Sequence, residues 1–329
     1  MGDELDTVAA ATRFSGVVRA DRGGEVVVER AYGFAHRGLG IPNTPATRFA
    51  AASGAKGLTA LAVMSLVEDG TLTLDTPARS LLGDDLPLID DAVTVEHLLA
   101  HRSGIGDYLD ESALESATDY VMPVPVHRLA TAEDYLQVLD GFPQVSPPGE
   151  RFAYNNGGFV VLALLAERAA RVPYHDLVRT RVCAPAGMRD TAFLRGDEPD
   201  DGVALGYLEP DGLRTNVLHL PVRGVGDGGN ATTAADMRAF WTALFAGRIV
   251  PPARVAEMVA PRSDADDARY GLGFWLAASG PGVVLVGSDA GVSFHSTHDP
   301  DQDLTATVIA NVTDGAWDMA EALERVLDL

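Results

Sequence analysis

The strand-like segments of this sequence lie at its two ends, and its main helical segments lie between them. Residues 14–20 and 25–34 are rich in β-branched residues and are joined by a Gly-containing turn, which predicts a hairpin. Further strand-like runs occupy the last third of the chain, at residues 271–277, 283–287, 294–298 and 304–312. The simplest packing joins both ends in one sheet flanked by helices. The pattern therefore predicts an α/β fold with an antiparallel sheet.

Helical periodicity is strongest at residues 53–69, where apolar residues recur three to four positions apart until Gly70. Other helices are predicted at residues 93–100, 159–171, 236–245 and 317–327. We expect residues 1–75 and 235–329 to form an α/β sheet domain, and residues 76–234 to form a mostly helical insertion. The active site is expected at the interface between these two domains.

The composition argues against several classes of partner. The 329 residues carry a formal net charge of −22, which repels nucleic acid and anionic membranes. The single cysteine, Cys183, cannot form an intramolecular disulfide or a cysteine metal cluster. The first residues are acidic where a signal peptide carries bases, and no apolar stretch is long enough to span a bilayer. We therefore expect a cytoplasmic protein that binds neither nucleic acid nor membrane; its oligomeric state is not predicted.

Lys56 is the only lysine in the sequence, which uses arginine for its other permanently cationic side chains. Arginine keeps its proton in proteins, whereas a buried lysine can lose it. Lys56 follows Ser53 by three positions, so on a helix the amine and the hydroxyl share one face. A desolvated lysine can activate such a serine as a nucleophile, and the helix N-terminus stabilises a developing oxyanion.

A second candidate motif, Tyr154-Asn155-Asn156, follows a turn at Pro148-Gly149. A tyrosine has a free pKa near ~10 and becomes a better base when a neighbouring cation lowers it. Next to Lys56, Tyr154 is expected to move protons between the serine and the leaving group. Asn156 is expected to hold Lys56 and a substrate amide oxygen. Taken alone, the motif also fits a surface turn with a packed tyrosine.

Together, Ser53-Gly54-Ala55-Lys56 and Tyr154-Asn155-Asn156 resemble the serine β-lactamase and penicillin-binding protein superfamily. The likeness is greatest to class C β-lactamases and the esterases and D-aminopeptidases related to them. Other stretches fit the same pattern in the same order, at residues 49–52, 94–104, 148–152, 228–233 and 270–275. The resemblance covers nearly the whole chain and implies a β-lactamase-like fold.

The resemblance also implies a mechanism. Ser53 attacks an acyl carbonyl, Lys56 and Tyr154 move its proton, and water later releases the acyl group. The resemblance further implies that the backbone amides of Ser53 and Gly291 hold the oxyanion. No metal ion or organic cofactor is implied, and the partner is a small-molecule ester, amide or peptide-like substrate.

The third motif of the family departs from the usual pattern. The family carries Lys-Thr-Gly or His-x-Gly on the strand beside the nucleophile, whereas here Ser288 is aligned with the Lys or His and Ala290 with the Gly. That cation helps to receive a substrate carboxylate, so its absence, with Asp289 alongside, argues against anionic substrates. We therefore predict an esterase or amidase for uncharged acyl groups rather than a β-lactamase. Compensation by Arg102 or Arg223 is left open.

Two other functions stay open at this point. An acyltransferase would use the same acyl-enzyme, and a catalytically silent binding protein would keep only the fold. A metal pair at His295 and His298 is disfavoured, because residues three apart on a strand point to opposite faces. The sequence contains no Gly-x-Ser-x-Gly, which argues against a serine esterase of the α/β-hydrolase type.

Overall fold

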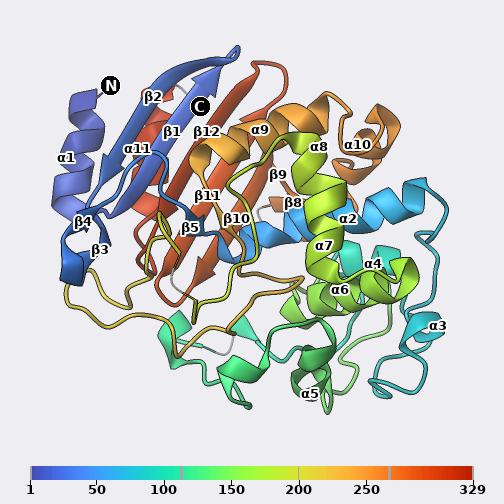
Figure 1. Ribbon diagram of the computed structural model, residues 1–329. Helices are drawn as coiled ribbons and strands as arrows, with labels where there is room; N and C mark the ends of the chain where they lie inside the picture. The colour runs from blue at the N-terminus through green and yellow to red at the C-terminus, as the bar shows by residue number, and fades with distance from the viewer. Residues whose placement is uncertain (1, 112–113, 199, 266–267, 328–329) are drawn as a thin grey trace.

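The computed structural model describes residues 2–111, 114–198, 200–265 and 268–327. Its centre is an antiparallel sheet of eight strands in the order β2-β1-β12-β11-β10-β9-β8-β7 (Figure 1). β1 (Gly16–Arg22) pairs on one side with β2 (Glu25–Tyr32) and on the other with β12 (Leu304–Ala310). Both ends of the chain therefore build one sheet, which confirms the predicted fold class.

The other half of the sheet comes entirely from the last third of the chain. It contains β11 (Val292–Asp299), β10 (Val283–Asp289), β9 (Trp275–Leu276), β8 (Ala268–Tyr270) and β7 (Ser263–Ala265). The strand predicted at residues 271–277 is reduced to β9, because Gly273 has a φ of +89° in the turn that joins β8 to β9. Two small sheets pair β3 (Phe34–His36) with β4 (Ile41–Pro42) and β5 (Phe49–Ala50) with β6 (Ala231–Thr232).

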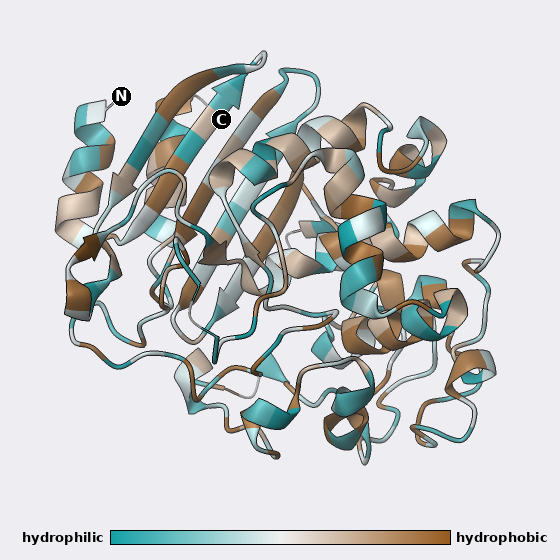
Figure 2. Ribbon diagram, in the orientation of Figure 1, coloured by the Kyte–Doolittle hydropathy of each residue, from teal (hydrophilic) through white to brown (hydrophobic). Residues whose placement is uncertain are grey.

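Helices cover both faces of the large sheet. They are α1 (Gly2–Thr12), α2 (Ala55–Glu68), α9 (Ala234–Phe245) and α11 (Trp317–Leu327). Val18 and Val308 pack in one core with α1 and α11, whereas Val17 and Ile309 pack in the other with α2 and α9. Side chains that are adjacent along a strand thus enter different cores, and Figure 2 shows apolar residues running along the strands of the sheet. The helix at the C-terminal end matches its prediction, whereas α1 was not predicted.

The middle of the chain is mostly helices and long connections. The helices are α3 (Arg79–Leu82), α4 (Val95–Leu99), α5 (Leu136–Leu139), α6 (Asn156–Ala170), α7 (Tyr174–Val178) and α8 (Ala184–Ala186), and α10 (Pro252–Met258) follows α9. One apolar core runs from the sheet through α2 into α6. The division into two domains with boundaries at residues 75 and 235 stays a prediction.

Helix α2 carries the candidate nucleophile into the centre of the molecule. All of its residues except Glu68 at its end are buried, as expected for a helix that is apolar on every side. It is preceded by a 3-10 turn, η2 (Ala52–Gly54), so Ser53 lies at the start of the helical segment. Ala52 has a φ of +43°, a conformation that costs free energy in a residue with a Cβ and that is common at functional sites.

Candidate active site

Lys56 lies at the centre of a buried hydrogen-bond network. Its side chain is 2% exposed, and Nζ lies 2.8 Å from Ser53 Oγ, 2.8 Å from Asn156 Oδ1 and 2.9 Å from the carbonyl oxygen of Asp227. Burial lowers the pKa of Lys56, and the negative charge of Asp227 is the largest opposing influence. The structure thus brings together the predicted residues Ser53, Lys56 and Asn156, and it favours loss of the lysine proton.

Tyr154 lies over the same network. Lys56 Nζ is 4.9 Å from the centroid of its ring, and its hydroxyl interacts with the Ser53 side chain. The expected lowering of its pKa by Lys56 is not found. Burial raises the pKa of Tyr154 well above its usual value, and the nearby carboxylate of Glu111 raises it further. Tyr154 is therefore a neutral phenol at the start of a reaction, which can relay a proton but does not begin as a base.

An aromatic shell fixes the orientation of Tyr154. The ring of His101 lies 4.4 Å from the Tyr154 ring, and Trp275 stacks on it at 6.0 Å. His101 Nδ1 accepts a hydrogen bond from the backbone N–H of Asn155 at 3.1 Å. Burial holds the pKa of His101 well below its usual value, so its ring is neutral. His101 thus packs among the aromatic side chains around Tyr154.

Asn156 is positioned by two acids that sequence reasoning missed. Asn156 Nδ2 donates to Glu111 Oε1 at 2.8 Å, while the carboxylate of Asp107 accepts hydrogen bonds from the backbone N–H groups of Asn156 and Gly157 at 2.6 and 2.8 Å. Burial raises the pKa of Asp107 to about 6. Both acids come from the loop that follows α4, and only the tertiary fold brings this loop to α6, so no local sequence pattern identifies them.

The third motif lies three residues earlier than predicted. A Cβ on Gly287 would lie 2.2 Å from the carbonyl oxygen of Ala51 and 2.9 Å from the amide nitrogen of Ser53, so the strand can pass the nucleophile only with glycine at this position. Gly287, not Ala290, therefore stands where the family places its glycine. Leu285 then occupies the Lys or His position, and its side chain is 2% exposed and packs against Gly57.

The side chain of Ser288 does not face the nucleophile. Because side chains alternate along β10, Leu285, Gly287 and Asp289 share the face that contacts α2, and the exposed Ser288 side chain points away from it. Among the described strands, β9 pairs with β10 only at Val283 and Val284. The backbone N–H of Val284 points toward β9. Backbone N–H groups alternate between the two edges of a strand, so the N–H of Ser288 points to the same edge, at a position where no described strand pairs with β10.

Gly291 is not brought to Ser53. It lies in the turn between β10 and β11 with a φ of +71°, where its N–H donates to Thr313 Oγ1 at 2.9 Å. That donor is therefore already in use, and the predicted oxyanion role of Gly291 is corrected.

Arg102 and Arg223 do not take the place of the missing cation. Arg102 donates to the carbonyl oxygens of Arg262 and Gly149, and Arg223 donates to the carbonyl oxygen of Phe193. Neither arginine lines the cavity onto which Ser53 opens. The compensation that the sequence left open is thus not provided by these two residues.

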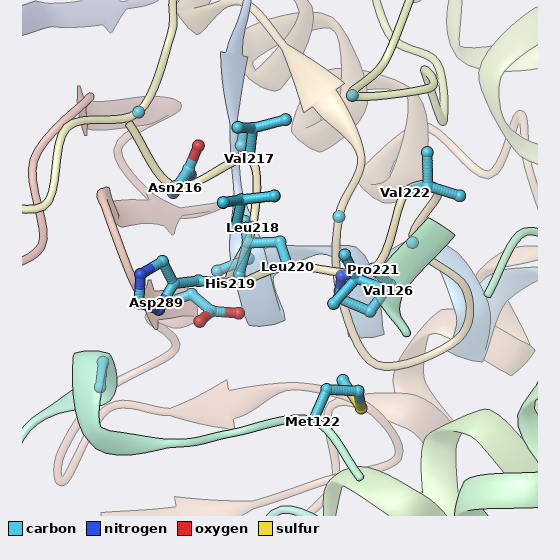
Figure 3. Close-up of a pocket in the computed structure, with 18 of the residues that line it drawn as sticks. Met122, Val126, Asn216, Val217, Leu218, His219, Leu220, Pro221, Val222 and Asp289 are labelled. Carbon is cyan, nitrogen blue, oxygen red and sulfur yellow. The ribbon is translucent and has the colours of Figure 1, made fainter. Parts of the chain in front are cut away.

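Ser53 opens onto a cavity of about 820 Å³. One wall, shown in Figure 3, presents apolar side chains from two connections: Met122, Val126, Val217, Leu218, Leu220, Pro221 and Val222. The lining is otherwise rich in acids: Glu111, Glu115, Asp197, Glu198, Asp200, Asp227 and Asp289. This space is large enough for a small organic substrate beside the serine.

Two further features of the structure concern metal ions and membranes. Across the described ranges, no three His, Cys, Asp or Glu side chains are grouped so that they could hold a metal ion. No helix in the same part of the chain is long and apolar enough to cross a membrane.

Comparison with known proteins places this site in a family. The family model described as Beta-lactamase matches residues 5–329. The structure is similar to the penicillin-binding protein from Bacillus halodurans, with a TM-score of 0.91 and 35% identity, over 98% of this chain and 99% of that one. It is also similar in sequence to the D-aminopeptidase of Brucella anthropi (29% identical; 94% of this chain, 58% of the relative) and to esterase EstB of Burkholderia gladioli (32% identical; 59% of this chain, 50% of the relative).

The chain spans about half to two thirds of the length of the curated relatives that it matches. The family match extends over nearly the whole chain, and the fold agrees with it from end to end. The chain therefore belongs to the beta-lactamase family, and an esterase and D-aminopeptidases are among its relatives.

Proposed function

We propose that this protein hydrolyses an ester or amide through an acyl-enzyme on Ser53. The observation that carries the proposal is the 2.8 Å contact between Ser53 Oγ and the buried Lys56 Nζ. A neutral amine has two N–H bonds, and Asn156 Oδ1 and the Asp227 carbonyl oxygen can accept both. The nitrogen lone pair is then left facing the Ser53 hydroxyl, which is the arrangement of a general base and its nucleophile.

In this mechanism the Ser53 oxygen attacks the substrate carbonyl while Lys56 takes the hydroxyl proton. The N–H groups of Ser53 and Ser288 are assigned to the oxyanion, since both lie where β10 passes the nucleophile. Tyr154 relays the proton to the leaving group as the C–O or C–N bond breaks. Water then attacks the acyl-enzyme and returns its proton through the same groups, which regenerates Ser53.

The choice of ester or amide over β-lactam rests on charge. Leu285 fills the position where the family carries Lys or His, and no cation replaces it among the described residues that contact Ser53 other than Lys56. The D-aminopeptidase and esterase relatives support hydrolysis of amides and esters as the general chemistry. The absence of this cation supports the prediction that anionic substrates are disfavoured, and the preference for uncharged acyl groups stays a prediction.

The test is intact-protein mass spectrometry after incubation with a fluorophosphonate and, separately, with benzylpenicillin, using Ser53→Ala as the control. We expect one fluorophosphonate adduct on the peptide containing Ser53, no penicillin adduct, and no adduct on the variant. A stable penicillin adduct on Ser53 would contradict the exclusion of β-lactams. A protein that is not modified by the fluorophosphonate would contradict the nucleophile itself and favour a silent binding protein.

A further inference from the structure

The cavity is acidic beside the nucleophile. Asp227, Asp289 and Glu111 line it together with Ser53. Among the described residues that line the cavity, the only arginine is Arg195, and it forms an ion pair with Asp197 at 2.8 Å. The other side chains of the described lining that can carry a positive charge are His36, His127 and His219.

Asp289 is directed into this cavity from β10. It follows Gly287 by two residues on the face that contacts the nucleophile, a separation of roughly 7 Å along the strand. Figure 3 shows its carboxylate facing the open space below the segment that contains Leu218. An atom bound by this carboxylate would therefore lie only a few bonds from a carbonyl group held at Ser53.

The Asp289 carboxylate has unused capacity for hydrogen bonds. One oxygen accepts from the backbone N–H of Ala290 at 2.7 Å, and no residue in the described part of the chain donates to the other. The two neighbouring acids each accept a hydrogen bond from a protein side chain, Asp227 from the Tyr108 hydroxyl at 2.5 Å and Glu111 from Asn156 at 2.8 Å. Among these three acids, Asp289 is the one to which no side chain in the described part of the chain donates.

The environment of Asp289 disfavours an isolated charge. Burial raises its pKa to about 7, and the carboxylates of Asp227 and Glu111 raise it further, while Lys56 acts in the opposite direction. A carboxylate withdrawn from water is costly unless it is paired with a cation. A cationic ligand group would remove this cost and form a charge-assisted hydrogen bond.

We propose that Asp289 binds an ammonium group of the substrate, so that the preferred substrates are amides or esters whose acyl part carries an amine a few bonds from the scissile carbonyl, as in amino acid amides. This proposal rests on the proposed acyl-enzyme function and narrows its substrate class. It concerns binding only: the ammonium N–H donates to the free Asp289 oxygen, and no covalent bond changes there.

The experiment measures how well matched amides protect Ser53 from a fluorophosphonate. Phenylalaninamide, as separate D and L enantiomers, is compared with 3-phenylpropanamide, which lacks the amine but has the same ring and carboxamide. We expect the better enantiomer to protect wild-type protein at a concentration at least about tenfold lower than 3-phenylpropanamide, because a hydrogen bond between charged groups is worth that much in binding. In Asp289→Asn we expect the ratio to fall to about one.

The matched control is Glu115→Gln, which removes the same charge from an exposed residue of the same cavity. It is expected to keep the protection ratio of the wild type. Equal protection by the amine and its deamino analogue in wild-type protein would overturn the proposal, as would an unchanged ratio in Asp289→Asn. A protein whose Ser53 the probe does not label would instead contradict the proposed function, so the two failures are distinguishable.

Discussion

On one side of the cavity, Ser53, Lys56 and Asn156 form a closed set of hydrogen bonds in which Lys56 is 2% exposed. On the opposite side, Val217 is 46% and Leu218 80% exposed, although both lie in the same cavity wall. The first side is held by a buried helix and strand, and the second by long connections. The candidate catalytic residues are therefore held by regular elements, whereas the exposed apolar wall is held by connections, which vary more readily.

The largest expected effect comes from changing the buried side at Lys56. Lys56→Met should lower kcat by roughly a thousandfold, because the general base is removed. The same change should lower the melting temperature, because Asn156 Oδ1 and the Asp227 carbonyl oxygen lose their buried hydrogen-bond donor. Ester hydrolysis and thermal unfolding measured on the same sample separate the two effects. A variant that keeps wild-type kcat would show that Lys56 is not the base.

Gly287 tests how tightly the strand and the nucleophile are packed. Gly287→Ala should destabilise the protein by about 1–3 kcal/mol and slow fluorophosphonate labelling at least tenfold, because the new Cβ would lie 2.2 Å from the Ala51 carbonyl oxygen. Denaturant unfolding and labelling rate are the measurements. The control is Gly38→Ala, where the nearest atom to the new Cβ, in His36, is 3.5 Å away. Equal behaviour of the two variants would contradict the placement of Gly287.

The pH dependence of the ligand preference tests the charge of Asp289. As pH rises through about 7, Asp289 loses its proton and gains affinity for an ammonium group, so the preference for phenylalaninamide over 3-phenylpropanamide should rise. It should fall again as the ligand's α-amine, with a pKa near ~8, becomes neutral. Asp227, Glu111 and Lys56 influence this titration in both cases and cancel in the ratio of the two ligands. The preference is measured by protection of Ser53 between pH 5 and 8. A ratio that does not rise between about pH 5 and pH 7 would contradict the role of Asp289.

The smallest effect is expected on the open apolar side. Leu218→Ala should raise KM for esters of long acyl chains two- to threefold, since about this much is lost when part of an apolar contact is removed, and kcat should be unchanged. The free energy of unfolding should change by less than about 0.5 kcal/mol, because the side chain is 80% exposed. Leu213→Ala, 66% exposed and outside the cavity lining, is the matched control. Identical KM values for both variants would exclude Leu218 from acyl binding.

Sequence patterns predicted the buried side well, because periodicity and local motifs report on regular elements. The helix at residues 317–327 and the pairing of both chain ends in one sheet were correctly predicted. The three-residue spacing of Ser53 and Lys56 also placed the two side chains in contact. Each of these predictions depends on residues that are close in sequence or on the alternation of a strand.

The features that were not predicted depend on contacts between segments that are far apart in the sequence. The register of β10 could not be fixed from sequence, because only the close contact of Gly287 with Ser53 identifies the glycine of the third motif. The pKa of Tyr154 was predicted with the wrong direction, since the sequence shows the nearby lysine but not the burial. The acids of the cavity lie in loops, and their positions follow from tertiary packing rather than from any local pattern.

The most direct test of the central claim compares hydrolysis of p-nitrophenyl butyrate by wild-type protein and by Ser53→Ala, with the wild type repeated after fluorophosphonate treatment. The account predicts measurable hydrolysis by the untreated wild type and the buffer rate for both the variant and the treated protein. Hydrolysis by Ser53→Ala at the wild-type rate would contradict the account, because the ester would then be cleaved without the nucleophile on which the proposed mechanism depends.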